Sequence, residues 1–385
     1  MSYILIFIAY FLQGVFYDSG GIFSQFLVSI LLTMGFISFI KLLFLRNKPI
    51  FINLWCAFYF MLLITYILSP KEVYGVAYEA IGRVNTMSQF KESSIFCFSF
   101  FVSYRLTSKN IYTDNQLYRL GLVFFVLALI RFFFSQAVLH EIGNIGSMTN
   151  NASYLLVSIV PFTPFIFKKN RIMFITVLIG ISSLVFIGAK RGAILCLFLS
   201  ILYSFFYIIK KMKLSIKSII GSLVVLLLII GISYNQYMEN EYVQYRFEKT
   251  LSEEGGIGAR EIAYNVLFYN WLEENNFLRF FLGNGTAQTI SVWGNYAHND
   301  WLELLTNNGL FGVLIYLSLF ISCFCVILKS KLDFYSLLSI HLCFIIWIVK
   351  SIFSMGYTDF SNSIFIIILG VMLGRINYCN SYGKK

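Results

Sequence analysis

Long apolar stretches constrain this chain more than any other feature of its sequence. A helix that crosses a bilayer needs roughly 20 predominantly apolar residues, and twelve segments come close to that length. Only 12% of the 385 residues are charged, whereas soluble domains carry about 25%. The sequence therefore predicts an all-α integral membrane protein, with residues 1–385 forming one polytopic domain in the lipid bilayer. The twelve predicted spans are residues 2–17, 22–45, 50–68, 86–104, 117–139, 152–167, 172–189, 192–209, 215–233, 309–328, 334–353 and 362–377.

The distribution of basic residues predicts how these spans are oriented. Cytoplasmic loops of membrane proteins are enriched in Lys and Arg. With the N-terminus placed inside, 18 of the 29 basic residues fall in inner segments, and the outer loops 18–21, 140–151 and 354–361 hold none. We therefore expect both termini in the cytoplasm and one large extracytoplasmic loop, residues 234–308, between spans nine and ten. The same bias accounts for the net charge of +11, so no nucleic-acid partner is expected.

Three basic residues depart from this pattern. Lys190 and Arg191 lie at the expected outer mouth of spans seven and eight, where two adjacent positive charges oppose the general bias. Arg191 either binds a ligand or anchors the chain at lipid headgroups. Arg131 lies inside the fifth span, where an unpaired charge costs at least about 2.5–3.5 kcal/mol. Arg131 therefore either lines a cavity, or it snorkels or pairs as a structural residue.

The large loop contributes further candidates. After the glycine-rich break at 255–259, residues 260–272 have apolar side chains at helical spacing, which predicts an amphipathic helix that starts at Arg260. The run 283–285, Gly-Asn-Gly, predicts a turn. Residues 298–307 then read as a short helix towards span ten, and the Asn-Gly pair at 308–309 breaks it at the membrane surface.

The residue types on the expected outer face suit one kind of chemistry. Arginine is always charged and forks onto phosphate oxygens, as Arg191 and Arg260 could. Histidine has an ordinary pKa near 6.5, so His298 could accept a proton near neutrality. The set fits an anionic diphosphate leaving group and a hydroxyl nucleophile. Asn299 and Glu303, one helical turn apart, are expected to support this set.

Other site chemistries find little support in the sequence. The three histidines are scattered along the chain, and no HExxH pattern, CxxC pair or Walker loop occurs. We therefore expect no metal and no cofactor.

Three segments resemble the signature region of the O-antigen polymerase and ligase superfamily. Residues 297–305 read AHNDWLELL, residues 188–193 read GAKRGA and residues 258–261 read GARE. The similarity covers roughly residues 180–315, in the order that the family has. The family often carries Ser or Gly before the arginine of the second motif, where this chain has Lys190.

The resemblance implies a metal-independent, inverting glycosyltransferase of the bacterial inner membrane, with its active site facing the periplasm and an undecaprenyl-diphosphate-linked glycan as substrate. It implies that Arg191 and Arg260 bind the donor diphosphate, with Lys190 as an additional contact. His298 would be the base that activates the acceptor hydroxyl. We expect a repeat-unit polymerase. An enzyme of this kind can have a chain-length regulator protein as a further partner. An O-antigen ligase is the first alternative, and a flippase of lipid-linked oligosaccharide is an alternative from another class.

Overall fold

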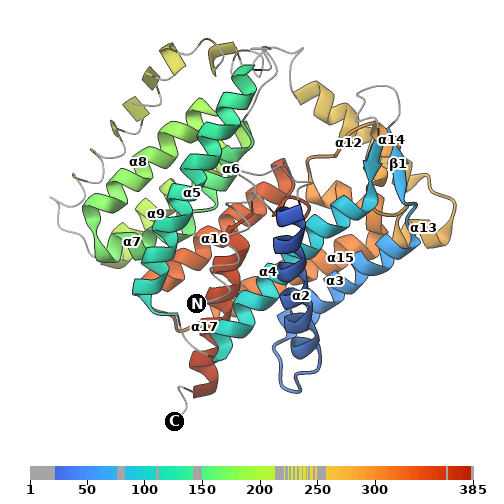
Figure 1. Ribbon diagram of the computed structural model, residues 1–385, viewed down its shortest axis with the longest axis horizontal. Coiled ribbons are helices and arrows are strands. Elements are labelled where there is room, and N and C mark those ends of the chain that lie inside the picture. The colour runs from blue at the N-terminus through green and yellow to red at the C-terminus, as the bar shows by residue number, and fades with distance from the viewer. Residues whose placement is uncertain are drawn as a thin grey trace.

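A computed structural model describes residues 22–75, 83–109, 112–141, 150–212, 257–360 and 363–382, with scattered positions between 221 and 248. The fold is helical (Figure 1). The predicted first span, 2–17, lies outside the described residues, and most of the predicted ninth span, 215–233, does too.

Six described helices are long and apolar enough to cross a membrane, and the chain is accordingly an all-α, multi-pass membrane protein. Each of the six matches a predicted span. They are α2 (Ile22–Leu43), α3 (Ile50–Leu68), α5 (Asp114–Glu141), α9 (Arg191–Met212), α15 (Asp300–Leu328) and α16 (Phe334–Phe353). The predicted spans 86–104, 172–189 and 362–377 correspond to the helices α4 (Thr86–Lys109), α8 (Arg171–Ile187) and α17 (Phe365–Tyr382).

The helix α16 lies between two groups of helices (Figure 1). One of its sides packs against α9 and α7 (Thr163–Lys169), and the other packs against α17 and α15. The helix α4 is buried between α17, α2 and α3. Gly370 and Gly374, four residues apart on α17, let the two backbones meet, because a Cβ at either position would come within 3.0 Å of α4 atoms. Small residues at this spacing are a common way to pack helices in membranes.

The predicted span 152–167 is helical but is not one continuous α-helix. The structure has three short helices there, α6 (Ala152–Val157), the 3-10 turn η1 (Val160–Phe162) and α7 (Thr163–Lys169). Pro161 and Pro164 explain the interruptions, because proline lacks an N–H and its ring clashes with the preceding helical turn.

The helix α15 contains the predicted break, because Gly309 has non-helical angles (φ 63°, ψ −163°). The predicted turn at 283–285 docks onto this break. Asn284 N donates to Thr306 O at 2.9 Å, and Gly285 N donates to Asn307 O at 3.0 Å. Thus the turn binds two carbonyls at the place where the helical ladder is interrupted.

Short elements surround this docked turn. They are α12 (Ile257–Leu272), α13 (Phe277–Leu282), α14 (Gln288–Trp293) and the antiparallel strands β1 (Glu72–Tyr74) and β2 (Arg83–Asn85). Val73 of the hairpin packs against Ala287 and Ile290, and Thr286 N donates to Ser69 Oγ at the end of α3 at 2.6 Å. The hairpin could not be predicted from the sequence, because strands of three residues are too short to show an alternating pattern.

The two ends of α16 carry different chemistry. At its start, Ser336 accepts a hydrogen bond of 2.8 Å from Arg375, which also pairs with Asp114 at 2.9 Å, and Asp114 also pairs with Lys168. All of these charged residues are predicted to face the cytoplasm. With 20 residues at about 1.5 Å each, α16 is about 30 Å long. Its far end lies beside the segments that carry the candidate site.

Candidate functional site

The Lys190–Arg191 motif is a tight turn between α8 and α9. Ala189 has a left-handed backbone (φ 46°), and Arg191 is the first residue of α9. Gly192 lies so close to α6 that a Cβ there would be 2.0 Å from the Tyr154 hydroxyl oxygen and 3.5 Å from the carbonyl oxygen of Phe353. The motif is therefore packed onto the last residue of α16.

His298 has a strained backbone conformation, and hydrogen bonds hold the residue on each side of it. Its φ is 51°, a left-handed conformation that costs a non-glycine residue roughly 1–2 kcal/mol. On one side, Ala297 N donates to Glu303 Oε1 at 2.6 Å. On the other side, Asn299 Nδ2 donates to Ile352 O at 3.0 Å. The histidine motif is thus tied to the same end of α16 as the arginine motif.

Asn299 also begins the helix that follows. Its Oδ1 accepts hydrogen bonds from Trp301 N and Leu302 N at 3.0 and 3.2 Å, so it is the N-cap of α15. The predicted helix start at His298 is therefore two residues early. Similarly, α12 begins at Ile257 rather than at Arg260, so its first turn includes the glycine at 258.

Burial and positive charge act together on His298. Burial, then Lys190 and Arg260, lower the pKa of this imidazole from 6.5 to about 4, against a smaller opposite effect of Asp359. The ring is consequently neutral at physiological pH and has an acceptor nitrogen. An anion bound by the two cations would oppose their effect and raise the pKa of His298.

The three cations expected to bind the diphosphate, Lys190, Arg191 and Arg260, are half-buried and lie around this end of α16. Lys190 and Arg260 both act electrostatically on His298. Arg260 also acts on Tyr154, against which the Arg191 turn packs. Since α9 and α15 both begin here, their N-terminal N–H groups add positive partial charge. The arrangement favours a bound anion with several oxygens.

Two acidic residues and one lysine lie next to these groups, and none of the three was predicted as a site residue. Asp300 is buried, and its carboxylate accepts from Gly356 N at 2.8 Å and from the Tyr316 hydroxyl at 2.9 Å. Lys350 is also buried, and its ammonium donates to Ser363 Oγ at 2.6 Å. Asp359 lies close enough to act electrostatically on both His298 and Lys350.

These contacts fix the segment 354–360 that follows α16. Gly356 is held from both sides, because its N–H donates to Asp300 and its carbonyl accepts from Ser363 Oγ at 3.0 Å. Lys350 could have been singled out, since it is a charged residue within the predicted span 334–353. Asp359 gave no such signal, because acidic residues are ordinary in outer loops.

Glu303 and Arg131 occupy different positions relative to the site. The Glu303 carboxylate is buried and accepts from Thr289 at 2.9 Å and Asn307 at 3.2 Å, in addition to Ala297 N. It therefore holds the backbone beside His298. Arg131 is half-buried on α5, one residue before Phe132, whose carbonyl accepts from Asn150 Nδ2 at 3.1 Å. A supporting role for Arg131 stays a prediction.

Among the described residues, no group of three or more His, Cys, Asp or Glu side chains could hold a metal ion. A search with protein-family models finds no match to this sequence, and neither does a search of curated proteins. The resemblance to the O-antigen polymerase and ligase superfamily therefore rests on the three sequence motifs.

Proposed function

We propose that this chain is a polymerase of O-antigen or capsule-type polysaccharide that transfers glycan from undecaprenyl diphosphate to an acceptor sugar hydroxyl. The observation that carries the proposal is the convergence of Lys190 and Arg260 on a neutral His298 at one end of α16. A cationic cluster beside a proton acceptor fits a reaction in which a diphosphate leaves and a hydroxyl attacks.

In the proposed reaction, the acceptor oxygen forms a bond to the anomeric carbon while the bond between that carbon and the diphosphate oxygen breaks. The hydroxyl proton passes to the acceptor nitrogen of His298. The bonding electrons leave with undecaprenyl diphosphate, which gains one negative charge. Arg191, Arg260 and Lys190 stabilise that charge as it develops. Direct displacement of this kind inverts the anomeric configuration.

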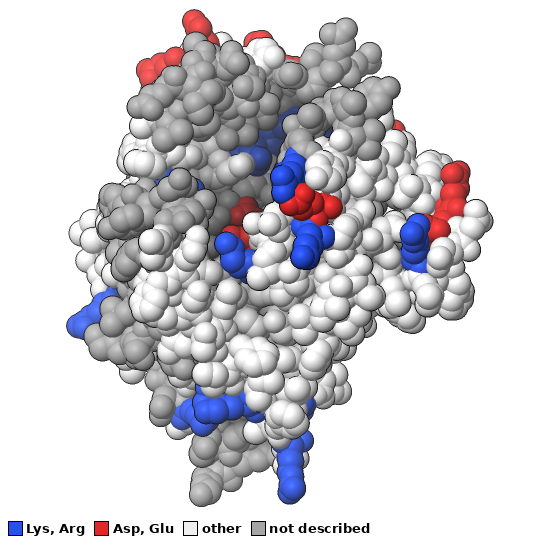
Figure 2. All heavy atoms as spheres, turned by 45° about the vertical axis from the view of Figure 1, so that its right-hand side comes forward, with Lys and Arg blue, Asp and Glu red and all other residues white. Residues whose placement is uncertain are grey.

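The proposal includes a topology of twelve spans in the bacterial inner membrane, with both termini in the cytoplasm and the site facing the periplasm. Its support is the separation of charge along α16. The Asp114–Lys168–Arg375 cluster lies at the start of this helix and the candidate site at its end, about one hydrocarbon thickness apart. Figure 2 shows basic side chains around a hollow in the upper half and again near the lower end, with a largely uncharged surface between them.

The polysaccharide profile of a deletion strain tests the activity. A polymerase predicts that long chains disappear while single repeat units remain attached to their acceptor. Loss of all attached chains would indicate a ligase, and lipid-linked units trapped on the cytoplasmic side would indicate a flippase. Complementation with His298→Ala should fail to restore long chains. His341→Ala is the matched control, because His341 bonds with the Tyr203 hydroxyl at 2.7 Å within the helix bundle.

Sidedness is tested separately with a membrane-impermeant thiol reagent in a cysteine-free background. Glu273→Cys in the large loop and Lys190→Cys in the turn should react from the periplasm. Lys329→Cys, at the opposite end of α15, should react only from the cytoplasm. Labelling of either of the first two positions only from the cytoplasm refutes the proposal.

A further inference from the structure

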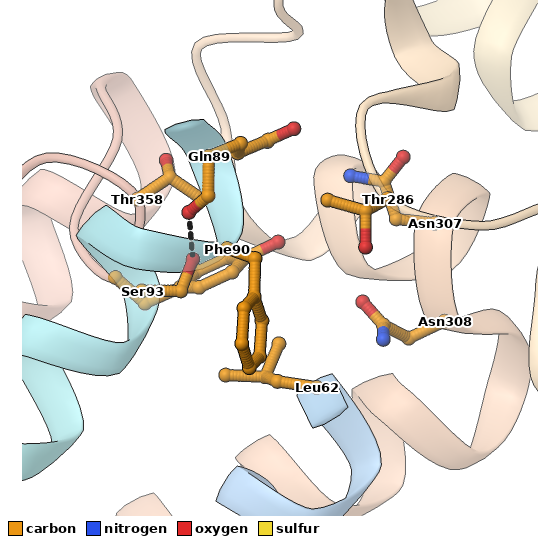
Figure 3. Close-up of a pocket in the computed structure, with 9 residues that line it drawn as sticks. Leu62, Gln89, Phe90, Ser93, Thr286, Asn307, Asn308 and Thr358 are labelled. Carbon is orange, nitrogen blue, oxygen red and sulfur yellow. Dashed lines mark hydrogen bonds between the residues drawn. The ribbon is translucent and has the colours of Figure 1, made fainter. Parts of the chain in front are cut away.

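A small polar pocket lies beside the candidate site, among residues that none of the three motifs predicted. Figure 3 shows side chains from the start of α4 across a gap from Thr286, which follows the docked turn 283–285, and from α15. The centre of a water molecule can occupy about 10 Å³ of this pocket, which is room for roughly one water molecule. Among the described residues that line it, none is charged. Those used below are Gln89, Phe90, Asn307, Asn308, Tyr357 and Thr358.

Two of these side chains are buried with an unused polar atom. Gln89 is 6% exposed and Thr358 is 7% exposed. Within the described part of the chain, the amide oxygen of Gln89 and the hydroxyl oxygen of Thr358 have no hydrogen-bond partner. Leaving buried polar atoms unsatisfied is costly, so a ligand that supplies partners for both would be stabilised there.

The opposite wall is already held in place by other bonds. Asn307 Oδ1 accepts from Gln288 N at 2.9 Å, and its Nδ2 donates to Glu303 Oε2. Asn308 Nδ2 donates to Thr65 Oγ1 at 2.6 Å. This wall is rigid before a ligand arrives, which lowers the entropy cost of binding.

One carboxylate links the pocket to the histidine. Glu303 Oε2 accepts from Asn307 in the pocket wall, and its Oε1 accepts from Ala297 N, next to His298. On the other side, Thr358 directly precedes Asp359, which acts electrostatically on His298. Glu303 therefore bonds both to the pocket wall and to the residue that precedes the proposed base.

We propose that this pocket is a subsite for one hydroxyl group of the acceptor glycan, an inference that rests on the proposed function. An uncharged lining selects a neutral ligand. An amide oxygen that accepts and a hydroxyl that can donate or accept match an alcohol O–H. The aromatic rings of Phe90 and Tyr357 can contact the apolar edge of a sugar. Because the space admits a single hydroxyl, the sugar ring lies outside it.

The test uses Gln89→Leu and Thr358→Val, which remove the unused polar atoms with little change in volume. Transfer is measured on full-length protein in lipid nanodiscs, with lipid-linked repeat units extracted from the host strain. Each variant should raise KM about fivefold, equivalent to about 1 kcal/mol, with kcat within about twofold. Thr358→Ser should restore the wild-type KM. Thr306→Val is the matched control, since Thr306 is buried and its hydroxyl is also unpartnered among the described residues, but it does not line the pocket.

The outcomes separate the two proposals. If wild-type protein transfers no glycan, the proposed function fails before any variant is made. If transfer proceeds and both variants keep the wild-type KM, the pocket is not a subsite, although the function stands. A lower melting temperature of Thr358→Val with unchanged KM would identify a structural water site, and a KM change equal to that of Thr306→Val would indicate general disturbance. Both results overturn the inference.

Discussion

Activity below pH 6 distinguishes a histidine with an ordinary pKa from His298 at the candidate site. The displacement of the His298 pKa from 6.5 to about 4 corresponds to about 3 kcal/mol in favour of the neutral ring. At pH 5.5 a histidine with pKa 6.5 would be about 9% neutral, whereas one with pKa 4 would be about 97% neutral. Since only the neutral ring accepts a proton, kcat/KM should be retained at pH 5.5.

The assay is the pH dependence of initial transfer rates in nanodiscs. The acid limb of kcat/KM reports the free enzyme, and that of kcat reports the complex with substrate. We expect the kcat/KM limb near 4 and the kcat limb at higher pH, because the bound diphosphate opposes the charges of Lys190 and Arg260. Lys190→Gln should move the kcat/KM limb upwards but keep it below 6.5, because burial is the largest cause of the low pKa and remains.

Direct titration gives an independent measurement. In protein labelled with ¹³C at histidine Cε1, the signal absent from His298→Asn belongs to His298, and it should titrate near 4 without substrate. A kcat/KM limb at 6.5 in the wild type would refute the reasoning. An unchanged limb in Lys190→Gln would show that Lys190 and His298 do not interact.

Three substitutions probe the supports of the site. Asn299→Ala removes a helix cap and the tie to α16, so it should cost about 2 kcal/mol of stability and about 100-fold in kcat/KM. Asp333→Ala, which removes the cap at the other end of α16, should cost only about 1 kcal/mol and leave activity within about twofold, so equal activity losses would contradict the argument. Lys350→Met should reduce the free energy of unfolding by about 3–5 kcal/mol and so lower the melting temperature, because Asp300 and Asp359 lose a buried counter-charge. An unchanged melting curve would count against this. Gly192→Ala should reduce activity about tenfold through collision with Tyr154, and adding Tyr154→Phe should recover most of it; no recovery would place the damage elsewhere.

The helices of this fold were predictable because a membrane span is a local property of the sequence. The length and apolar character of residues 50–68 and 334–353 define α3 and α16 to the residue. The interruption of the helix within 152–167 was not predicted although Pro161 and Pro164 were visible, because mean hydropathy does not register a missing N–H. The topology of twelve spans stays a proposal.

The residue types of the candidate site stood out in the sequence, but their assembly did not. Lys190 and Arg191 stood out because their charge opposed the expected bias. Nothing in the sequence placed Lys190 and Arg260 beside His298, because contacts between distant segments depend on how α9, α12 and α15 pack. Asp359 and Gln89 gave no signal for the same reason, since what distinguishes them is their surroundings in the folded chain.

The docking of the Gly-Asn-Gly turn on the interrupted helix has a consequence for how this protein can diversify. The bonds from Asn284 and Gly285 to α15 join main-chain atoms, so they survive almost any exchange of side chains around them. Gly283 and Gly309 are fixed, because a Cβ at either would come within 2.6 Å of main-chain atoms on the opposing segment, and Gly285 is constrained by its φ of 114°. Side chains at neighbouring positions can therefore change by ordinary drift while the frame around the histidine keeps its shape.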